Sequence, residues 1–420
     1  MLMQFWQGRE SLKSLSKLKT AHKSIFADII TPEKKSMVFN EQWLKLGWSK
    51  NYNELWTIQW NMSEVFRAVI LGKTRSGKTW FTRRVGTVAF NSGYSVIYLT
   101  DIKNEMKTSK QPLQDKFKKF LAEGEYPISC PTVTLRPKFM DNMLGASILD
   151  DEQYFQLSLG DISSPDLLLL LNFTTDKSKN QIQIVTNIWA KVISGEIKNL
   201  QEFHDAVGKD PAQKALKQSI LNALQPLIAY EVVGEQLLIN WATQLNNNIV
   251  TINLEGYDQV SAHYMQAYVR IIMRIIYNLR KKGLLKKRVI IFIDEAGRFL
   301  REDSISGQEI RRQVDESAYL GIFMLISAQP LNQIPKAVTA QARYILLPRS
   351  YEFDEMFKVL RFAQIYRGNR ADKQDFSEQL TTLHDTKDGQ KMWLMLDTAE
   401  HKLIKIYPFA PLSWHDESKK

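Results

Sequence analysis

One stretch in the N-terminal part of the chain decides the fold, and it consists of Ala68-Val69-Ile70-Leu71-Gly72-Lys73-Thr74-Arg75-Ser76-Gly77-Lys78-Thr79. The first four residues are apolar, which predicts a buried strand that runs directly into a loop. From Lys78 to Phe90 the sequence predicts a helix, and Asn91-Ser92-Gly93 ends it. The loop between strand and helix matches the phosphate-loop pattern of one glycine, four residues of any kind and Gly-Lys-Thr. The pattern therefore has the strand-to-helix setting that phosphate binding requires.

The residue types in this loop suit the binding of a nucleoside triphosphate. Glycines let backbone N–H groups curl around the phosphates, and the N-terminus of the helix adds partial positive charge. We expect Lys78 to reach the β- and γ-phosphates and the Thr79 hydroxyl to bind Mg²⁺. The predicted cofactors are ATP and Mg²⁺. The predicted nucleotide-binding residues are Gly72, Lys73, Thr74, Arg75, Ser76, Gly77, Lys78, Thr79 and Trp80.

A second apolar run, Val289-Ile290-Ile291-Phe292-Ile293, predicts a buried strand that ends in two acids. Asp294 and Glu295 follow at its carboxyl end, where ligands bind in sheets of this kind. We expect Asp294 to hold Mg²⁺ through water. We expect Glu295 to act as general base on the attacking water, because that role needs a carboxylate near the γ-phosphate but not on the metal. Apolar strands that end in two acids are common, so this pair is informative only together with the phosphate loop.

Two more polar segments follow predicted strands. Gln329 follows the strand Ile322 to Ser327, where its amide can contact both the γ-phosphate and the attacking water, although a surface-loop glutamine is the alternative. Asp101-Ile102-Lys103-Asn104-Glu105 follows the strand Tyr94 to Thr100 and adds charged groups to the same edge, with a solvated turn as the alternative. The predicted catalytic residues are Lys78, Glu295 and Gln329.

The alternation of apolar strands with helical stretches divides the chain. It starts after residue 65, gives way to mainly helical periodicity, and resumes with the strand Ile249 to Leu254. We predict an α/β core with a mainly parallel sheet flanked by helices at 65–105 and 248–410, and an inserted helical subdomain at 106–247. A basic, helical N-terminal extension covers 1–64, and a polar tail covers 411–420. Near the C-terminus, Met392 to Leu396 and Leu403 to Ile406 predict a hairpin.

Composition favours an acidic partner. The chain has 420 residues, 44% of them hydrophobic, a formal net charge of +11 and a pI near 9.3. Clustered Lys and Arg gain from releasing counterions condensed on DNA, RNA or a membrane surface, although a solvated basic surface is equally consistent with the charge. The candidate DNA contacts are Lys281, Lys282, Lys286 and Lys287, a cluster that also suits the exposed lead-in to a buried strand.

The sequence also argues against several classes of protein. Cys130 is the single cysteine, which excludes an intramolecular disulfide framework and fits a reducing compartment. The six histidines lack the spacing of a metal site. No segment has the roughly 18 uninterrupted apolar residues of a membrane span. We therefore expect a cytoplasmic protein without an integral membrane segment, in the host cytoplasm if the protein is viral.

The ordered segments resemble the HerA-FtsK superfamily of hexameric DNA pumps, which includes type IV secretion ATPases, conjugative coupling proteins and viral genome-packaging ATPases. The resemblance implies a RecA-like P-loop ATPase core in which Lys78 and Thr79 bind nucleotide and Mg²⁺, the Asp294-Glu295 pair drives hydrolysis and Gln329 is the sensor. The short N-terminal region and the lack of a transmembrane pair favour a packaging or plasmid-type motor. The segments that match are 72–79, 101–105, Ile290-Ile291-Phe292-Ile293-Asp294-Glu295-Ala296, and Gly321 to Pro335.

The resemblance further implies a homo-oligomer, a hexamer in that superfamily, whose neighbouring subunits supply an arginine finger. Members often carry basic residues before the strand that leads to the glutamine, whereas this chain has Glu316-Ser317-Ala318-Tyr319-Leu320. No finger can therefore be transferred from that stretch. The candidates, each of which also suits a structural or DNA-facing role, are Arg311, Arg312, Arg343 and Arg349.

Three functions remain open. The leading one is an oligomeric ATPase that translocates DNA, expected to be double-stranded, for genome packaging, plasmid transfer or end-processing. Its further partner would be a capsid, a nuclease or a membrane complex. The second is a secretion or pilus-type ATPase that acts on a protein at a membrane assembly, supported only by a basic helix around Leu12 to Leu18. The third is a nucleotide-dependent scaffold without catalysis.

Overall fold

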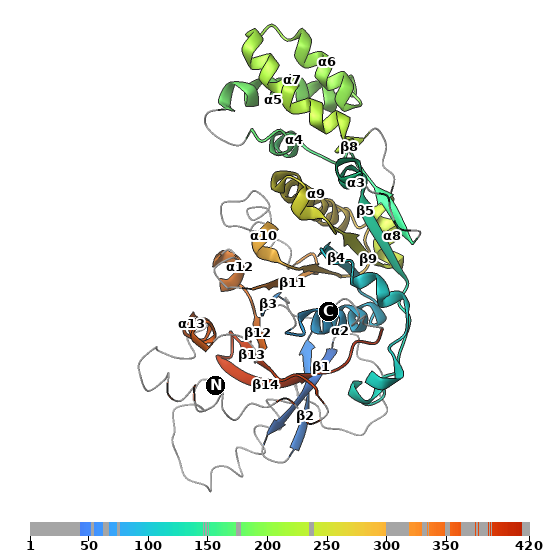
Figure 1. The fold of residues 1–420 in the computed structure, drawn as a ribbon, viewed down its shortest axis with the longest axis vertical. Coiled ribbons are helices and arrows are strands. Elements are labelled where there is room, and N and C mark those ends of the chain that lie inside the picture. The colour runs from blue at the N-terminus through green and yellow to red at the C-terminus, as the bar shows by residue number, and fades with distance from the viewer. Residues whose placement is uncertain are drawn as a thin grey trace.

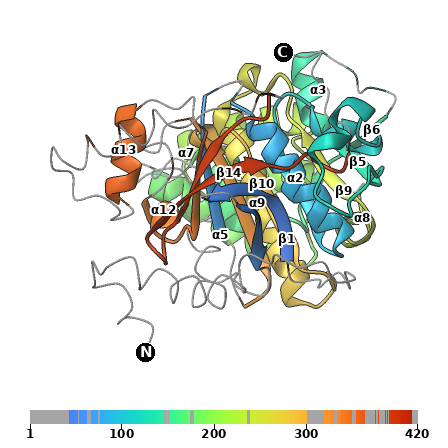
Figure 2. The same ribbon diagram turned by 90° about the horizontal axis from the view of Figure 1, so that it is seen from below.

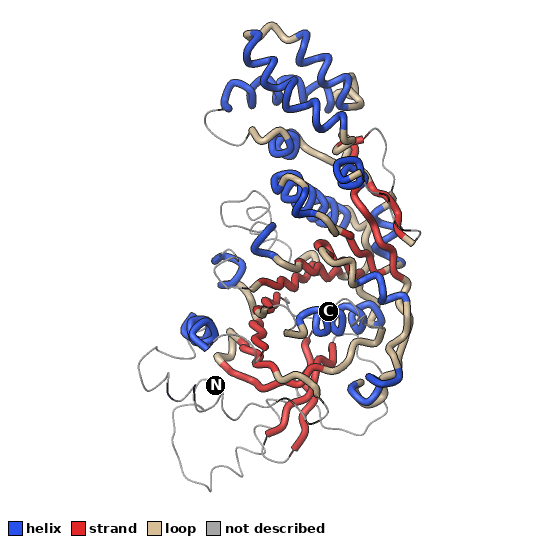
Figure 3. The backbone as a smooth tube through the Cα atoms, viewed as in Figure 1, coloured by secondary structure: helices blue, strands red, loops and turns tan. Residues whose placement is uncertain are grey.

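The computed structural model describes residues 43–51, 54–61, 67–73, 76–145, 151–173, 178–234, 239–299, 319–329, 336–348, 353–362 and 389–413, with single positions between some of these ranges. Its centre is a curved sheet that appears as a continuous band in Figure 3. In the described part of the chain this sheet has 12 strands, in the order β2-β1-β14-β13-β12-β3-β11-β10-β4-β9-β5-β6.

Eight neighbouring strands of the sheet, from β12 to β6, are all parallel. The predicted strands of the core are confirmed here. Strand β11 lies between β3, which leads into the phosphate loop, and β10, which ends in the two acids. Their bounds are β3 Arg67–Leu71, β4 Ser95–Asp101, β5 Thr132–Pro137, β6 Glu152–Phe155, β9 Ile249–Asn253, β10 Val289–Ile293, β11 Ile322–Ala328 and β12 Tyr344–Pro348.

Helices cover both faces of the parallel strands. Alternate residues of β10 point to opposite faces: Ile290 and Phe292 join one apolar cluster, and Ile291 joins the other. Helix α2 (Lys78–Asn91) packs on the first face through Phe81 and Val85, and α9 (Ala262–Lys281) packs on the second. Both faces are therefore buried, which explains why these strands are continuously apolar.

The second face also carries shorter helices. They are α3 (Lys138–Leu144), α8 (Trp241–Asn247), α10 (Ala296–Phe299) and α12 (Lys336–Ala340), with α13 (Phe353–Phe362) further along the chain. Short 3-10 turns are η2 (Met106–Lys110), η3 (Asp115–Phe120) and η5 (Tyr257–Gln259).

At the C-terminal end, β13 (Trp393–Asp397) and β14 (Lys402–Pro408) form the predicted antiparallel hairpin, which is confirmed. The strands β1 (Trp43–Asn51) and β2 (Glu54–Asn61) then extend the sheet, with Gly47 opposite Pro408. The helical character predicted for the N-terminal extension is therefore wrong for residues 43–51 and 54–61. The predicted basic helix around Leu12 to Leu18 lies outside the described residues.

The predicted insert, 106–247, is only partly helical. Its strands β5 and β6 join the main sheet beside β9, and a two-stranded sheet joins β7 (Leu157–Ser158) to β8 (Val233–Gly234). Within this insert, α4 (Ser164–Leu170) begins with a capping box, in which Ser163 N donates to Asp166 Oδ2 at 2.7 Å.

The helical part of this insert lies at one end of the molecule. It contains α5 (Lys179–Ile193), α6 (Leu200–Lys209) and α7 (Lys214–Ala229), which lie at the top of Figure 1. Seen from below, β1 and β14 lie in front of these helices (Figure 2). The helices and the antiparallel strands therefore occupy opposite ends of the long axis, with the phosphate loop between them (Figure 1).

Candidate functional site

The phosphate loop joins β3 to α2 in a geometry that requires its glycines. Gly77 has a φ of +94°, a conformation that residues with a Cβ rarely adopt. A Cβ on Gly72 would lie 2.6 Å from Ser76 Oγ and 2.7 Å from Pro348 Cγ. The N–H of Gly72 also donates to the Ala328 carbonyl at 3.1 Å, which fixes the loop to the end of β11. Thr74 and Arg75 lie outside the described residues.

The Lys78 side chain turns back over the loop. Its Nζ donates to the carbonyl of Gly72 at 2.5 Å and to that of Lys73 at 3.2 Å. Burial lowers the pKa of Lys78, and the negative charges of Asp294 and Glu295 partly offset this. The predicted lysine and the predicted acids are therefore within electrostatic reach of one another.

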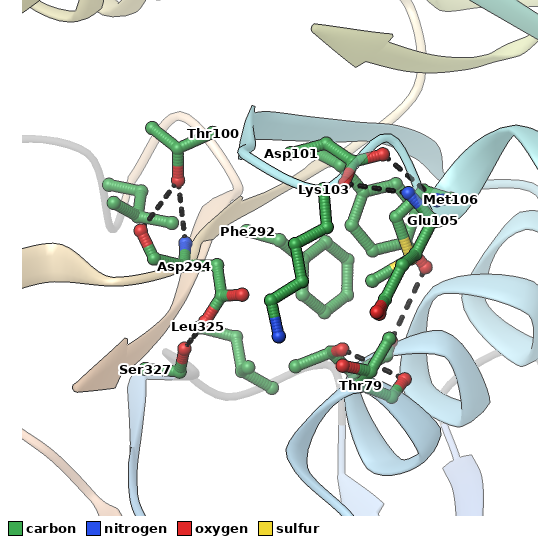
Figure 4. Close-up of a pocket in the computed structure, with 13 residues that line it drawn as sticks. Thr79, Thr100, Asp101, Lys103, Glu105, Met106, Phe292, Asp294, Leu325 and Ser327 are labelled. Carbon is green, nitrogen blue, oxygen red and sulfur yellow. Dashed lines mark hydrogen bonds between the residues drawn. The ribbon is translucent and has the colours of Figure 1, made fainter. Parts of the chain in front are cut away.

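Asp294 is held at the end of β10 by two neighbouring strands. The Asp294 N–H donates to Thr100 Oγ1 at 2.7 Å, and Thr100 Oγ1 donates to the Asp294 carbonyl at 2.8 Å. Ser327 Oγ of β11 donates to Asp294 Oδ1. One carboxylate oxygen is therefore engaged, while the other points into the adjoining pocket (Figure 4).

Glu295 and Gln329 meet beside Asp294, at the ends of β10 and β11. Gln329 Nε2 lies 3.4 Å from Glu295 Oε1, and Arg298 Nε lies 4.0 Å from Glu295 Oε2. Glu295 has a φ of +48°, which costs a non-glycine residue about 1–3 kcal/mol and is typical of functional sites. The carboxylate is only 17% exposed, so it is partly shielded from bulk water.

A pocket of about 400 Å³, including the open space at its mouth, lies beside these residues. Its lining includes Thr79 from α2, Asp294 from β10 and Ser327 from β11 (Figure 4). The Thr79 hydroxyl and the Asp294 carboxylate are hard oxygen ligands, so this pair fits Mg²⁺ that is completed by phosphates and water. Among the residues that the structure describes, no group of three His, Cys, Asp or Glu side chains could hold a metal ion by itself.

The wall of the pocket opposite Asp294 is the turn after β4. Asp101 closes this turn: its Oδ1 accepts from Glu105 N at 3.0 Å, and its Oδ2 accepts from Met106 N at 2.8 Å and from Thr251 Oγ1 at 3.0 Å. Burial raises the pKa of Asp101 to about 6, although the N–H groups of Met106 and Glu105 favour its charged form. The alternative of a solvated turn is therefore wrong for Asp101, which is 7% exposed.

The sequence indicates that Asp101 to Glu105 is a charged segment after a strand, but it does not predict that Lys103 lines the pocket. It likewise missed Thr100 and Ser327, whose hydroxyls hold Asp294. A polar residue at the end of an apolar strand is the signal that could have found both hydroxyls.

The remaining predicted residues lie elsewhere or are not described. Arg343 is bound within its own chain, with its Nε 2.9 Å from Asp397 Oδ1. Trp80 stacks edge-on against Phe117, with ring centroids 5.2 Å apart. Three arginine-finger candidates lie outside the described residues: Arg311, Arg312 and Arg349.

The basic cluster before β10 lies at the amino-terminal edge of the sheet, opposite the phosphate loop. Lys287 Nζ donates to the Asn246 carbonyl at 2.7 Å and lies over the ring of Phe90. Lys287 therefore makes a structural contact at this edge of the sheet. The other three are exposed: Lys281, Lys282 and Lys286.

The fold and the site geometry together define a RecA-like P-loop ATPase architecture. No protein-family model matches the sequence, and no curated protein matches it. Solved structures match by fold. The structure of VirB4 of Thermoanaerobacter pseudethanolicus superposes with a TM-score of 0.57 at 10% identity, over 89% of this chain and 98% of that chain.

The plasmid coupling protein TrwB in complex with ADP and Mg²⁺ superposes with a TM-score of 0.51 at 13% identity, over 84% of this chain and 89% of that chain. The trigonal form of TrwB in complex with sulphate gives a TM-score of 0.50 at 12% identity, over 83% and 88%. The chain therefore shares the fold of VirB4 and TrwB, in agreement with the fold that the resemblance of its motifs implied.

Proposed function

We propose that this protein is an ATP-hydrolysing oligomeric motor that translocates DNA, with double-stranded DNA as the track. One observation carries the ATPase part of the proposal. Two strand ends and one helix start bring the residues of nucleotide hydrolysis to the same edge of the sheet, namely Lys78, Thr79, Asp294, Glu295 and Gln329.

Each of these residues has a separate role in hydrolysis. On nucleotide binding, Lys78 would exchange the carbonyls of Gly72 and Lys73 for oxygens of the β- and γ-phosphates, and Thr79 and Asp294 would hold Mg²⁺. Bound Mg²⁺ neutralises charge on the phosphates. Glu295 accepts the proton of the attacking water, and the Gln329 amide orients that water beside the carboxylate.

The DNA part of the proposal rests on charge and on fold. A net charge of +11 favours a polyanion as partner, and the motif order resembles a superfamily of DNA pumps. In a ring, an arginine from the neighbouring subunit would complete the site, which would couple hydrolysis to assembly.

Capsid, nuclease or membrane-complex partners remain open within this proposal. We assign the motor to the cytoplasm. No helix of the described residues has the length and apolar character needed to cross a bilayer.

The proposal is tested by ATPase rate and mass together. The rate is measured without nucleic acid, with single-stranded DNA and with duplex DNA, and the mass is measured by light scattering under the same conditions. We expect duplex DNA to stimulate turnover and the mass to rise to that of a multimer. Turnover that DNA leaves unchanged, in a protein that stays monomeric, would refute the proposal.

A second candidate is an ATPase that acts on a protein at a membrane assembly. VirB4 superposes on this chain with a TM-score of 0.57, and the superfamily that the motifs resemble includes type IV secretion ATPases. The two candidates differ in their affinity for DNA. A DNA motor binds duplex with an affinity that falls steeply as salt rises, because phosphate contacts release counterions. Absence of such binding would favour the second candidate.

A further inference from the structure

Lys103 is a lysine of the pocket that lies outside the phosphate loop. It belongs to the turn after β4, and it lines the pocket together with Thr79, Asp294 and Ser327. Figure 4 shows its side chain extending across the pocket, with the ammonium group between the Asp294 carboxylate and Thr79. Lys103 therefore faces the place where the chain's own residues fit Mg²⁺ and the terminal phosphate.

The backbone that carries Lys103 is fixed on both sides. Asp101 accepts hydrogen bonds from the N–H groups of Glu105 and Met106, which closes the turn around Lys103. Asn104 is fully buried, has a φ of +51°, and donates from Nδ2 to Glu152 Oε1 at 2.6 Å.

Helix α2 holds the turn from the other side. Arg83, which is fully buried, donates to the carbonyl of Glu105 and to the hydroxyl of Thr108 at 2.5 Å. The turn is therefore attached to the helix that begins at the phosphate loop. This arrangement fixes the point from which the Lys103 side chain reaches into the pocket.

A second ammonium group, that of Lys78, lies over the phosphate loop, where its Nζ donates to the carbonyls of Gly72 and Lys73. The charges of Lys103 and Lys78 are close enough to repel each other. An anion between the two groups is attracted to both and relieves their repulsion. A triphosphate whose β- and γ-phosphates contact Lys78 would place its terminal oxygens on the Lys103 side, next to Thr79 and Asp294.

We propose that Lys103 binds the γ-phosphate of ATP in its own subunit and thereby distinguishes ATP from ADP. The inference rests on the proposed ATPase function and adds a residue to its site. Because ADP lacks the γ-phosphate, the contact with Lys103 is available only to the triphosphate. Lys103 would then favour the binding of ATP over the retention of ADP, the product of hydrolysis.

The test measures nucleotide affinity by calorimetry in the presence of Mg²⁺, with ADP and with a non-hydrolysable ATP analogue. Wild type is compared with Lys103→Ala, with Lys103→Arg, and with Lys107→Ala as control. Lys107 lies in η2, directly after this turn, and outside the pocket lining. We expect Lys103→Ala to weaken binding of the analogue at least tenfold, and binding of ADP less than twofold. Lys103→Arg should restore part of the affinity, and Lys107→Ala should match wild type.

Two results would overturn the inference. In the first, Lys103→Ala weakens both nucleotides equally or neither, so that the residue does not read the γ-phosphate. In the second, Lys103→Ala tightens both nucleotides, which would mean that the ammonium competes with Mg²⁺. The proposed function fails separately, and visibly, if wild type binds neither nucleotide.

Discussion

At the scale of single residues, Glu295 combines a predicted catalytic position with a backbone conformation that non-glycine residues rarely adopt. Its N–H donates to Asp294 Oδ1 at 3.0 Å, and its carbonyl accepts the Arg298 N–H at 2.9 Å, which starts α10. These contacts hold the left-handed turn that directs the carboxylate toward Gln329. The backbone strain is therefore placed where a general base must be oriented.

Glu295→Gln should separate binding from hydrolysis. The amide keeps the size of the side chain but cannot accept a proton, so ATP turnover should fall by on the order of 10²-fold or more. Affinity for ATP, measured with the same calorimetry, should stay within a few-fold of wild type. Glu196→Gln is the control, because Glu196 lies on the loop between α5 and α6. Normal turnover in Glu295→Gln would instead support a scaffold that does not depend on hydrolysis.

Asp101 predicts a pH dependence of stability with a definite sign. Burial raises its pKa from 3.8 to about 6 in the folded chain, so its stabilising contribution is complete below pH 3.8 and is lost as pH rises through about 6. Asp101→Asn removes the titration and several hydrogen bonds. The difference in melting temperature, wild type minus variant, should therefore decrease between about pH 4 and about pH 6 and then level off. A difference that grows over this interval would contradict the assigned pKa direction.

At the scale of elements, helix α2 links the phosphate loop to the ends of the described chain. Arg84 of α2 is fully buried and donates to the Lys45 carbonyl of β1 at 2.6 Å and to the Ala410 carbonyl at 3.0 Å. Its guanidinium also pairs with Glu125 at 2.6 Å, whose side chain is 5% exposed. One side chain thus fixes the antiparallel strands and the C-terminal segment against the nucleotide-binding helix.

Arg84→Ala should destabilise the protein by about 3–5 kcal/mol, because it leaves a buried carboxylate and two buried carbonyls without their donor. Thermal denaturation measures the loss. The double variant Arg84→Met with Glu125→Leu should recover part of it, since no charge is then buried alone. Lys110→Ala removes an exposed pair with Asp151 and should change the melting temperature little. Equal losses for the single and double variants would rule out the unpaired charge as the cause.

The sequence predicted where strands of the core end, but it did not predict which strands lie next to one another in the sheet. Apolar runs located β3, β10 and β11, and the residues after them located the side chains that we propose for hydrolysis, because these are local signals. Strands β1 and β5 depend on pairing with segments more than 100 residues away, such as Gly47 with Pro408 and Val133 with Val250. Local sequence does not encode such partners, because β-propensity depends on context.

The dependence on strand order and tertiary contacts also explains which residues of the site were not predicted from the sequence. The roles of Thr100 and Ser327 follow from the adjacency of β4, β10 and β11, which becomes visible only when the sheet order is known. Lys103 was named as part of a charged segment, but its position in the pocket depends on a turn closed by tertiary contacts. The arginine finger belongs to a neighbouring subunit in the proposed assembly, so one chain does not identify it.

At the scale of the whole molecule, the proposed motor needs a track and a ring as well as a site. The parallel strands place the candidate site at one edge of the sheet, and the helices α5, α6 and α7 extend the long axis beyond it (Figure 1). A net charge of +11 makes duplex DNA a favourable track, which the protein would grip by its backbone without reading sequence. Movement along DNA is therefore the central claim, and it requires more than hydrolysis.

Displacement of a third strand from a duplex tests that claim most directly. A labelled oligonucleotide is bound as a triplex at one end of a long duplex, and its release is followed with wild type, with Glu295→Gln, and with a non-hydrolysable ATP analogue. We predict release by wild type with ATP, and none in the other two cases. If wild type hydrolyses ATP in the presence of duplex DNA and leaves the third strand in place, translocation along double-stranded DNA is contradicted.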